Sequence, residues 1–475
     1  MAELENQLNI RLVNCPFFEA LEAEKYGTYR RKIKNAVALF SAQNVEFQKE
    51  VQLQSKAFGR ILSQMTIGMD GQQLTLQKAS TLLEENDRNV RRQVYHKINQ
   101  RIFQDTEELE DLFGSLLGKR HQIALNAGFA NYRDYAFKAL ERFDYTPEDC
   151  FDFHDSISSE ILPLLNTIYQ TRKELLQLDS LRPYDLNIDT QGREVLRPFK
   201  DSSELVTQSI RCLNQVHPSF GEVIQKMQEL GHLDLDSRPG KRPGGYNMPL
   251  HETGLPFIFM NATASVGDLR TLMHESGHAI HAYLTCDLEI AATRQFPSEI
   301  SELAAMTMEL FTMEHWQTIF EREEDLQRAR LLQMEMVIKV LPWIATIDKF
   351  QHWLYTHPGH SRAERREQWL AILQEFTPGV LENTGLEKYL SNLWLKQLHI
   401  FEVPFYYIEY GFAQLGAIAL WQKYHQSPAE AIDQYIASLK LGYTRSVTEV
   451  YEAAGIQFDF SREYVSHLGQ FIQQK

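Results

Sequence analysis

Most of the sequence repeats apolar residues at the spacing of an amphipathic α-helix. Residues 61–129 alternate apolar and charged positions in this way, with short breaks at Gly71 and Gly128. Thr146 and Pro147 fit the N-cap and first position of a further helix. The same character continues in four later segments, around 201–230, 322–340, 361–376 and 427–441. We therefore expect a mainly α fold.

One region departs from this helical pattern. Residues 181–199 and 237–268 are rich in proline, glycine and β-forming residues, and the run LPFIFMN within the second segment predicts a strand bounded by turns. A small β-sheet therefore interrupts the helical protein. The composition changes gently near residues 180–200, and we place a boundary there, with an N-terminal helical region at 1–185 and a second region at 186–475.

Charge and cysteine content restrict the kind of protein. The formal net charge of -15 argues against nucleic-acid binding, because few basic groups are free to neutralise phosphates. The four cysteines form no close pair and indicate free thiols in a reducing compartment. The N-terminus lacks the apolar run of a signal peptide, and no apolar stretch approaches the ~18 residues of a membrane span. We expect a soluble, cytoplasmic protein.

The stretch TLMHESGHAIHAYL, residues 271–284, predicts a metal-binding helix. His274 and His278 are four residues apart, so on a helix both imidazoles project from one face and can share a metal ion. Glu275 is adjacent to the first histidine, where its carboxylate can take a proton from a water that zinc has activated. Alone, the motif is also compatible with polar residues on a helix surface that bind no metal.

A catalytic zinc site needs a third protein ligand. A metzincin site requires glycine at position 281 and histidine at position 284, but these positions hold His281 and Leu284, so that class is excluded. The next apolar helix, which we expect to begin at residues 297–298, carries Glu299, Glu302 and Glu309. Buried carboxylates need a partner. We prefer Glu302 as the ligand and keep Glu299 as its rival, since a first-turn glutamate also complements the helix dipole.

Three further residues are assigned supporting roles. His281 shares the face of the two ligand histidines, but a fourth protein ligand would close the site, so we interpret it as structural. Asp268 is a natural N-cap that could also orient a ligand histidine, and Glu309 is the stronger candidate for that orienting role.

A second informative stretch lies at residues 396–421. After a proline, the pattern predicts a helix that carries Tyr406, Tyr407 and Tyr410, with His399 just upstream. Tyrosine hydroxyls and an imidazole are donors that can stabilise the oxyanion of a tetrahedral intermediate. The alternative interpretation is an aromatic core helix with a hydrogen-bonded histidine.

The segments HESGHAIH, SELAAMTME and HIFEVPFYYIEYGFAQLGA resemble the M3 family of zinc metallopeptidases, the oligoendopeptidase F and thimet oligopeptidase group, and its bacterial branch in particular. The resemblance extends over about residues 60–460. It implies two helical lobes around a deep substrate channel, with a small β-sheet beside the HExxH helix. The sequence is shorter at its N-terminus than typical members, and HIFEVP replaces the glycine-rich loop of the thimet branch.

The resemblance also implies roles for individual residues. In the family pattern E-x(6)-E the first glutamate is the third zinc ligand, which matches Glu302, so His274, His278 and Glu302 would hold one Zn²⁺ per chain. Its downstream histidine and tyrosines match His399, Tyr407 and Tyr410, with Tyr406 as a possible substrate contact. The segment GGYNMPLHETGLPFIFMN resembles the edge strand and loop that hold peptide backbone, which implies four substrate contacts, at Gly244, Gly245, Phe259 and Asn261.

The resemblance implies a zinc-dependent endopeptidase that cleaves short unstructured peptides, as a monomer or a weak homo-oligomer, with Glu275 as general base. Two other classes stay open. One is a catalytically inactive helical peptide-binding protein, and the only argument for it is the short N-terminus. The other is a zinc hydrolase that acts on a non-peptide amide.

Overall fold

The computed structural model describes residues 2–238, 240–242, 244–250 and 252–475. These residues are mainly helical, as the sequence predicts, with a two-stranded and a three-stranded sheet. Among the described helices, none combines the length and the apolarity that a membrane crossing requires.

The first third of the chain forms the helices α1 (Ala2–Val13), α2 (Ala23–Leu39), α3 (Asn44–Ser63), α4 (Leu76–Ser80), α5 (Arg88–Gln104), α6 (Thr106–Asn126), α7 (Tyr132–Ala139), α8 (Pro147–Ser156) and α9 (Leu162–Leu175). Helix α8 begins as expected after Thr146, which forms a capping box with Asp149.

One part of the predicted helical pattern is wrong. The residues around Gly71 form an antiparallel hairpin of β1 (Thr66–Met69) and β2 (Gln72–Thr75). Asp70 and Gly71 both have positive φ angles, 48° and 79°, which is the backbone that a two-residue hairpin turn requires. The Asp-Gly pair between short runs of β-forming residues was the signal for this turn.

The remaining chain begins with α10 (Ser202–Val216), α11 (Pro218–Glu229), β3 (Leu233–Asp236), β4 (Tyr246–Met248), β5 (Phe257–Ala262), α12 (Val266–Leu284) and α13 (Ser298–Met313). It ends with α14 (Glu323–Thr356), α15 (Arg362–Glu375), α16 (Glu387–Leu390), α17 (Leu398–Glu402), α18 (Tyr407–Gln426), α19 (Pro428–Lys440), α20 (Val447–Ala453) and α21 (Arg462–Gln473).

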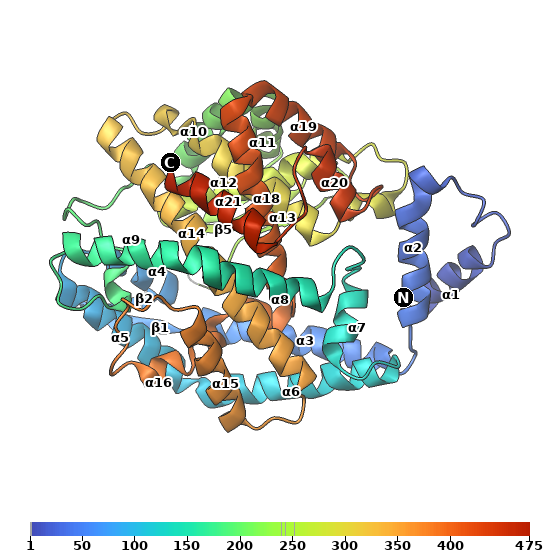
Figure 1. The fold of residues 1–475 in the computed structure, drawn as a ribbon, viewed down its shortest axis with the longest axis horizontal. Coiled ribbons are helices and arrows are strands. Elements are labelled where there is room, and N and C mark those ends of the chain that lie inside the picture. The colour runs from blue at the N-terminus through green and yellow to red at the C-terminus, as the bar shows by residue number, and fades with distance from the viewer. Residues whose placement is uncertain (1, 239, 243, 251) are drawn as a thin grey trace.

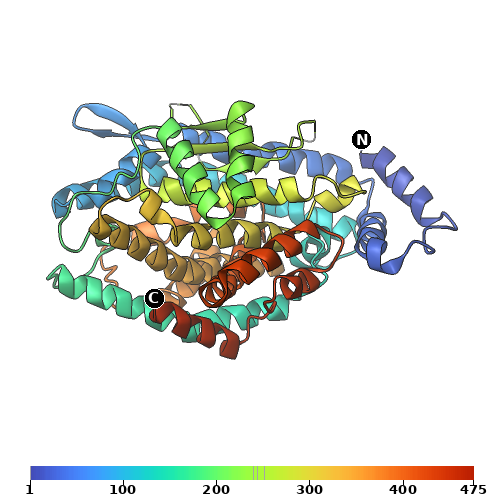
Figure 2. The same cartoon turned by 90° about the horizontal axis from the view of Figure 1, so that it is seen from above.

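The helices form two lobes that are joined by the long helix α14 (Figure 1). One lobe contains α10–α13 and α18–α21, and the other contains α3–α7 with α15–α17. Helices α8 and α9 run between the lobes, and α1 and α2 project to one side (Figures 1 and 2). Because α15–α17 return to the lobe of α3–α7, that lobe combines segments from both of the regions that we predicted from the sequence.

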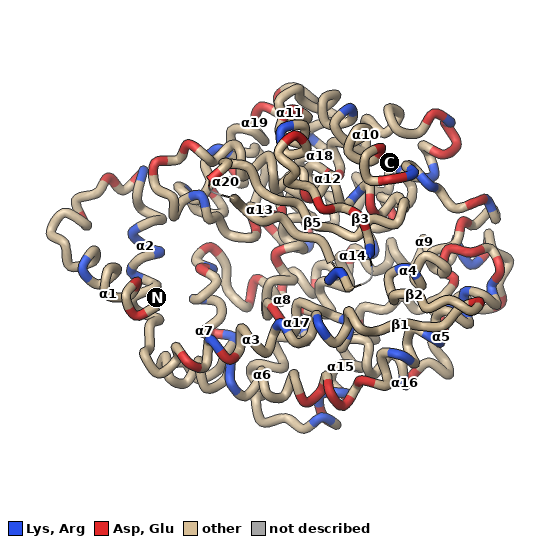
Figure 3. Tube along the Cα trace, turned by 180° about the vertical axis from the view of Figure 1, so that it is seen from behind, with Lys and Arg blue, Asp and Glu red and all other residues tan. Residues whose placement is uncertain are grey.

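The metal-binding helix predicted from the sequence, α12, lies inside the first lobe. It packs against α13 on one side, and α13 in turn packs against α18. The three-stranded sheet, in the order β3-β5-β4, lies beside α12 (Figure 3). One continuous apolar core extends from Phe58 on α3 to Ile472 on α21, so both lobes support the position of α12.

Candidate functional site

Helix α12 begins at a well-defined cap. Ser265 is the N-cap, and its hydroxyl accepts a hydrogen bond from the backbone N–H of Asp268. The Asp268 carboxylate in turn accepts from the backbone N–H groups of Thr263 and Ser265. Asp268 is therefore at the third helical position and not at the N-cap, and its partners are the cap residues and not a ligand histidine.

The structure brings together His274 and His278 from α12 and Glu302 from α13. Their ligand atoms all lie within 4.8 Å of one another. The Nε2 atom of His274 is 3.2 Å from Glu302 Oε2, and the Nε2 atom of His278 is 3.8 Å from Glu302 Oε1. Two imidazoles and one carboxylate at this spacing are the donor set of a catalytic zinc site.

Close packing of the two helices makes this spacing possible. Gly277 lies between the two histidines, and a Cβ atom at this position would be 2.6 Å from both Ala304 O and Ala305 Cα. Only glycine here, facing small residues on α13, lets the two helix backbones approach so closely. That approach carries Glu302 to the histidines.

The other ring nitrogen of each histidine has its own partner. His274 Nδ1 lies 2.8 Å from Glu309 Oε1, and the second oxygen of Glu309 accepts a hydrogen bond from Gln333 Nε2 at 3.0 Å. His278 Nδ1 lies 3.0 Å from the hydroxyl of Ser301. Because a carboxylate only accepts, the proton on His274 Nδ1 is donated to Glu309, and Nε2, the nitrogen that faces Glu302, is the one that could bind a metal ion.

The electrostatics of the site suit a cation. Burial alone would raise the pKa of Glu302, but His278 and His274 lower it to about 2. Burial would lower the pKa of His274, but the carboxylates of Glu302 and Glu309 raise it well above its usual value. The Oε2 atom of Glu302 is buried without a hydrogen-bond partner. A positive ion between these donors would satisfy that atom, so the residues fit a zinc ion.

Glu275 lies beside this cluster with the properties of a general base. It is 5% exposed, and its Oε2 atom has no hydrogen-bond partner. Burial raises its pKa to about 7, against the opposing effect of His274 and with a further increase from Glu302 and Glu309. A carboxylate with a pKa near neutral pH can both take up and release a proton.

The rival ligand Glu299 lies elsewhere. Its carboxylate accepts a hydrogen bond from the buried hydroxyl of Tyr145 at 2.6 Å. Burial raises its pKa, while the nearby Arg142 and the Tyr145 hydroxyl lower it. Glu299 is thus part of a buried polar cluster that also contains the Arg142–Glu409 ion pair, in which the two side chains are 2.9 Å apart.

His281 also lies away from the cluster. Its ring is fully buried and stacks on Phe296 with a centroid separation of 3.5 Å. Burial lowers its pKa to about 3, so the ring is neutral. This environment agrees with a structural histidine and not with a fourth ligand.

The aromatic wall of the site comes from the start of α18. Tyr406 and Tyr410 line a cavity of about 240 Å³ together with His274, Glu275 and His278. Neither His399 nor Tyr407, both predicted from the sequence as catalytic, is among the residues that line this cavity.

The tyrosines face different partners. The Tyr406 hydroxyl donates to Glu302 Oε1 at 2.6 Å, so it acts on a ligand residue. The Tyr410 hydroxyl lies 3.4 Å from His399 Nε2, and burial raises the pKa of Tyr410 well above its usual value, so it keeps its proton. Tyr407 packs against the His399 ring with centroids 4.8 Å apart.

Gln397 fixes the proton of His399. The indole N–H of Trp343 donates to Gln397 Oε1 at 3.2 Å, which leaves the Gln397 amide nitrogen to donate to His399 Nδ1 at 2.7 Å. Burial lowers the pKa of His399 to about 4, so at neutral pH the ring has one proton, and that proton is on Nε2. His399 can therefore donate to the Tyr410 oxygen, which frees the hydroxyl proton of Tyr410 to point into the site.

The sheet differs from the expectation in one respect. The strand of the LPFIFMN run, β5, is the central strand, and Phe259 is paired with both Asp234 and Tyr246. An interior strand has no free backbone groups for a peptide, so the edge strand beside the site is β4. The side chain of Asn261 donates to the carbonyls of Arg242 and Gly244 and so supports the loop before β4.

Of the substrate contacts predicted in the segment before α12, Gly245 lies in the cavity lining, next to Tyr246 and Asn247. A Cβ atom at Gly245 would be 3.4 Å from Glu275 Oε1. Gly244 has a φ of 97°, a conformation that glycine adopts without strain. The pair thus lets the chain pass close to the general base before it enters β4.

Sequence reasoning missed several residues of the site. Three of them form hydrogen bonds with His278, Glu309 and His399, and the fourth lets two helices pack closely: Ser301, Gln333, Gln397 and Gly277. Ser301 and Gln333 occur in ordinary helical patterns and gave no signal. Gly277, in contrast, is a glycine in mid-helix, and the next helix carries the small residues Ala304 and Ala305, a pattern that could have indicated a close helix crossing.

The sequence of the chain is similar to those of known oligopeptidases. The family model described as peptidase family M3 matches residues 81–470. Oligopeptidase PepF of Bacillus subtilis is 22% identical over 390 residues, which are 81% of this chain and 56% of that protein. An oligoendopeptidase F homolog of Borreliella burgdorferi is 22% identical over 395 residues, which are 81% of this chain and 64% of that protein.

Solved structures agree over the whole chain. A putative oligoendopeptidase F has a TM-score of 0.95 and 26% identity, and the match covers 100% of this chain and 83% of that one. Pz peptidase A, solved with an inhibitor, has a TM-score of 0.94 and 25% identity, with 100% and 84% covered. By contrast, the chain spans less than two thirds of the length of the Bacillus subtilis and Borreliella burgdorferi relatives.

Proposed function

The chain belongs to peptidase family M3, and on this basis we propose that it is a zinc-dependent endopeptidase that hydrolyses internal bonds of short, unstructured peptides. One observation carries the proposal. The donor atoms of His274, His278 and Glu302 lie within 4.8 Å of one another, and Glu275 lies beside them on the same cavity.

His274, His278 and Glu302 would hold the zinc ion. When bound, zinc supplies a Lewis acid that polarises a peptide carbonyl and makes a water acidic enough to lose a proton near neutral pH. Glu309 and Ser301 support the two imidazoles from behind. The chain's own residues supply the other steps.

Glu275 is the general base. It takes a proton from the attacking water as the water oxygen adds to the carbonyl carbon. It then gives this proton to the departing amine nitrogen as the C–N bond breaks. Its pKa of about 7 supports both transfers, since neither protonation state is strongly disfavoured at neutral pH.

Tyr410 is the oxyanion donor in this proposal. Its hydroxyl lies on the cavity, and His399 donates to its oxygen from outside the cavity. A hydroxyl that accepts one hydrogen bond is a better donor to the developing negative charge. Tyr406 has a different task, because its hydroxyl holds Glu302 in position.

Strand β4 is the proposed docking edge for the peptide backbone. It is paired with β5 on one side only, and it is next to Glu275, since the side chain of Asn247 donates to the carbonyl of Glu275 at 3.3 Å. An extended peptide could add to the free edge as a further strand. We also propose that the lobes confine the substrate to a channel, which would exclude folded proteins.

The test is hydrolysis of quenched-fluorescent peptides of five to fifteen residues by the purified chain, with and without a metal chelator. We expect cleavage of the shorter unstructured peptides, loss of cleavage with the chelator, and recovery on addition of zinc. If the protein binds zinc stoichiometrically but cuts no peptide of any length, the proposal is wrong and a binding function or a non-peptide amide substrate replaces it.

A further inference from the structure

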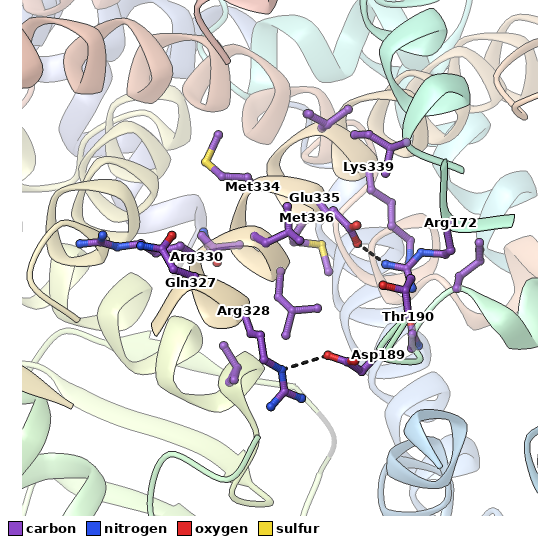
Figure 4. A pocket seen from close by; sticks show the side chains of 18 of the residues that line it. Arg172, Asp189, Thr190, Gln327, Arg328, Arg330, Met334, Glu335, Met336 and Lys339 are labelled. Carbon is purple, nitrogen blue, oxygen red and sulfur yellow. Dashed lines mark hydrogen bonds and ion pairs between the residues drawn. The ribbon is translucent and has the colours of Figure 1, made fainter. Parts of the chain in front are cut away.

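A second and larger cavity, of about 970 Å³, is shown in Figure 4, and its lining includes the start of α12, the helix that carries His274 and His278. It is bounded by α9, the 186–196 loop, the first turns of α12 and the N-terminal half of α14. Seven lysine or arginine residues and four acidic residues line it, although the whole chain has a net charge of -15. The cavity is therefore basic in an acidic protein.

Three of the seven cations in this cavity, Arg172, Arg193 and Arg328, have close carboxylate partners. Arg172 Nη2 is 2.6 Å from Glu335 Oε2, and this ion pair is drawn in Figure 4. Asp189 bridges Arg193 and Arg328 at 3.0 and 2.9 Å. These acids are therefore not free to neutralise another cation.

Lys339 on α14 lacks such a partner. No carboxylate of the described residues lies within 4 Å of its ammonium group, and its one hydrogen bond is a long one, 3.4 Å to Asn187 Oδ1. Figure 4 shows Lys339 extended alongside Arg172. Burial lowers the pKa of Lys339. The nearby Glu335 raises this pKa, and the positive charges of Arg172 and Arg270 lower it further. Lys339 thus lies in a basic environment that an anion would stabilise.

Arg270 on α12 is only loosely paired. Its Nε atom is 3.9 Å from Glu309 Oε2, an oxygen that already accepts from Gln333, and its side chain is 26% exposed. The other Glu309 oxygen contacts His274. Arg270 therefore retains donors that can bind a ligand in the cavity.

Both cations lie one helical turn from groups of the catalytic centre. Arg270 precedes His274 by four residues on α12, and Lys339 precedes Trp343 by four residues on α14. Trp343 donates to Gln397, which contacts His399. One turn of helix advances ~5.4 Å, so each of these two residues lies about one turn along its helix from His274 or Trp343.

We propose that Lys339 and Arg270 bind the C-terminal carboxylate of the peptide substrate. The inference rests on the proposed peptidase function and adds a specificity to it. A peptide presents one terminal carboxylate, and two residues of extended chain beyond the scissile bond carry it ~7 Å, three residues ~10 Å. The enzyme would then cut a small and fixed number of residues from the C-terminus of its substrates.

The test compares three peptides of one sequence that is cleaved: the free acid, the C-terminal amide, and an amide whose last residue is aspartate. For the wild-type enzyme we expect a KM that is ~10-fold lower for the free acid than for the plain amide, with similar kcat, because one charge-assisted contact is worth about this factor. A side-chain carboxylate as the true ligand would give the aspartyl amide the same advantage.

The variant Lys339→Met should remove most of this preference, with no change in kinetics on the plain amide. Lys339→Arg keeps the charge and should keep the preference, which also shows that the position tolerates substitution. Lys349→Met is a matched control on the same helix, because Lys349 pairs with Glu375 at the surface, far along α14 from the cavity. It should behave as the wild type.

The possible failures are distinguishable. If the wild type cleaves the acid and the plain amide with equal KM, the carboxylate site is wrong while the peptidase function stands. If the preference is present but survives in a folded Lys339→Met enzyme, Lys339 is not the anchor. If the zinc-loaded wild type cleaves none of the peptides, the proposed function itself fails and the inference fails with it.

Discussion

Glu299 and Glu302 are two buried glutamates on the same helix, α13, and they differ only in their partners. Glu302 faces the two histidines of α12, and Glu299 faces Tyr145 and the Arg142–Glu409 pair. Three residues rotate the second side chain by nearly a full turn but still leave ~60° between the two directions. At the residue scale, this difference decides which carboxylate is available to a metal ion.

A pair of alanine variants checks this assignment. We expect Glu302→Ala to be purified without stoichiometric zinc, because two imidazoles alone form an incomplete site. Glu299→Ala should retain one zinc per chain but melt at a lower temperature, because the Tyr145 hydroxyl loses a buried acceptor. Metal analysis of both variants is the measurement. Full zinc in Glu302→Ala with loss in Glu299→Ala would reverse the assignment.

The three tyrosines of α18 give a second test at this scale. Tyr410→Phe should lower kcat by ~10²-fold or more with zinc content unchanged, since an oxyanion donor is lost. Tyr406→Phe should weaken zinc binding instead, because its hydroxyl holds Glu302. Tyr407→Phe should stay near the wild-type rate. Steady-state kinetics and metal content separate these cases, and an unimpaired Tyr410→Phe enzyme would contradict the proposed role.

The proposed ligands and one residue that supports them, Glu309, could be predicted from the sequence, but the other supporting residues could not. Spacing along one helix determines that His274 and His278 share a face, and the resemblance to peptidase family M3 separated Glu302 from Glu299. The contacts of Gln333 and Gln397 depend on how α14 crosses the other helices. No local pattern in the sequence encodes such a crossing.

At the scale of elements, the crossing of α12 and α13 determines the geometry of the site. Gly277 on α12 meets the backbone of α13 at Ala304 and Ala305, two and three residues beyond Glu302. A larger residue at this crossing would separate the helices, and with them the donors that the helices carry.

The variant Gly277→Ala tests this constraint. The added methyl group would lie 2.6 Å from backbone atoms, so α13 must shift, and we expect the free energy of unfolding to fall by about 1–3 kcal/mol and zinc to bind more weakly. Gly118→Ala is the matched control, because Gly118 lies within α6 with nothing within 4 Å of its Cβ position. It should be neutral or stabilising. Chemical denaturation and zinc titration give both quantities, and equal behaviour of the two variants would contradict the account.

The strands could be predicted less well than the helices. The run that forms β5 is recognisable from its β-forming residues, but its place between β3 and β4 depends on pairing with two separate segments earlier in the chain. The hairpin of β1 and β2 is embedded in a long helical pattern, and only Asp70 and Gly71 indicate it.

At the scale of the whole molecule, the lobes are joined by a continuous core and by buried polar networks. In one network, His154 on α8 lies 2.9 Å from Asp348 on α14, and both residues are fully buried. Burial lowers the pKa of His154 in spite of the raising effect of Asp348. The network contains none of the residues proposed to bind zinc, so its titration can be studied in the presence of a chelator.

This network predicts a loss of stability in acid. A histidine whose pKa is lowered by folding binds fewer protons in the folded than in the unfolded chain near and below pH ~6.5. The free energy of unfolding therefore has its full value above pH ~6.5 and decreases as the pH falls below this value. At pH 5.5 the loss is at most about 1.4 kcal/mol for one such histidine. The comparison of wild type and His154→Gln at pH 7.5 and 5.5, both in chelator, measures it. We expect a smaller loss in the variant, and an equal loss would exclude His154 as a contributor.

The family and the mainly α fold, both predicted from the sequence, are confirmed by the family match over residues 81–470 and by the fold of solved oligoendopeptidases. The arrangement of the lobes was less predictable. Helices α15–α17 return to the lobe of the N-terminal helices through contacts such as those of α17 with α3, which join residues far apart in the chain. Composition near residues 180–200 carries no information about that return.

The central claim is that Glu275 acts as general base beside a zinc ion held by His274, His278 and Glu302. The most direct measurement is the rate of peptide hydrolysis by Glu275→Gln relative to wild type, each at a measured zinc content. We predict one zinc per chain in both proteins and a kcat/KM that is lower by ~10²–10⁴-fold in the variant, since the glutamine amide cannot accept the proton. A zinc-loaded variant that cleaves peptides at the wild-type rate would contradict the claim.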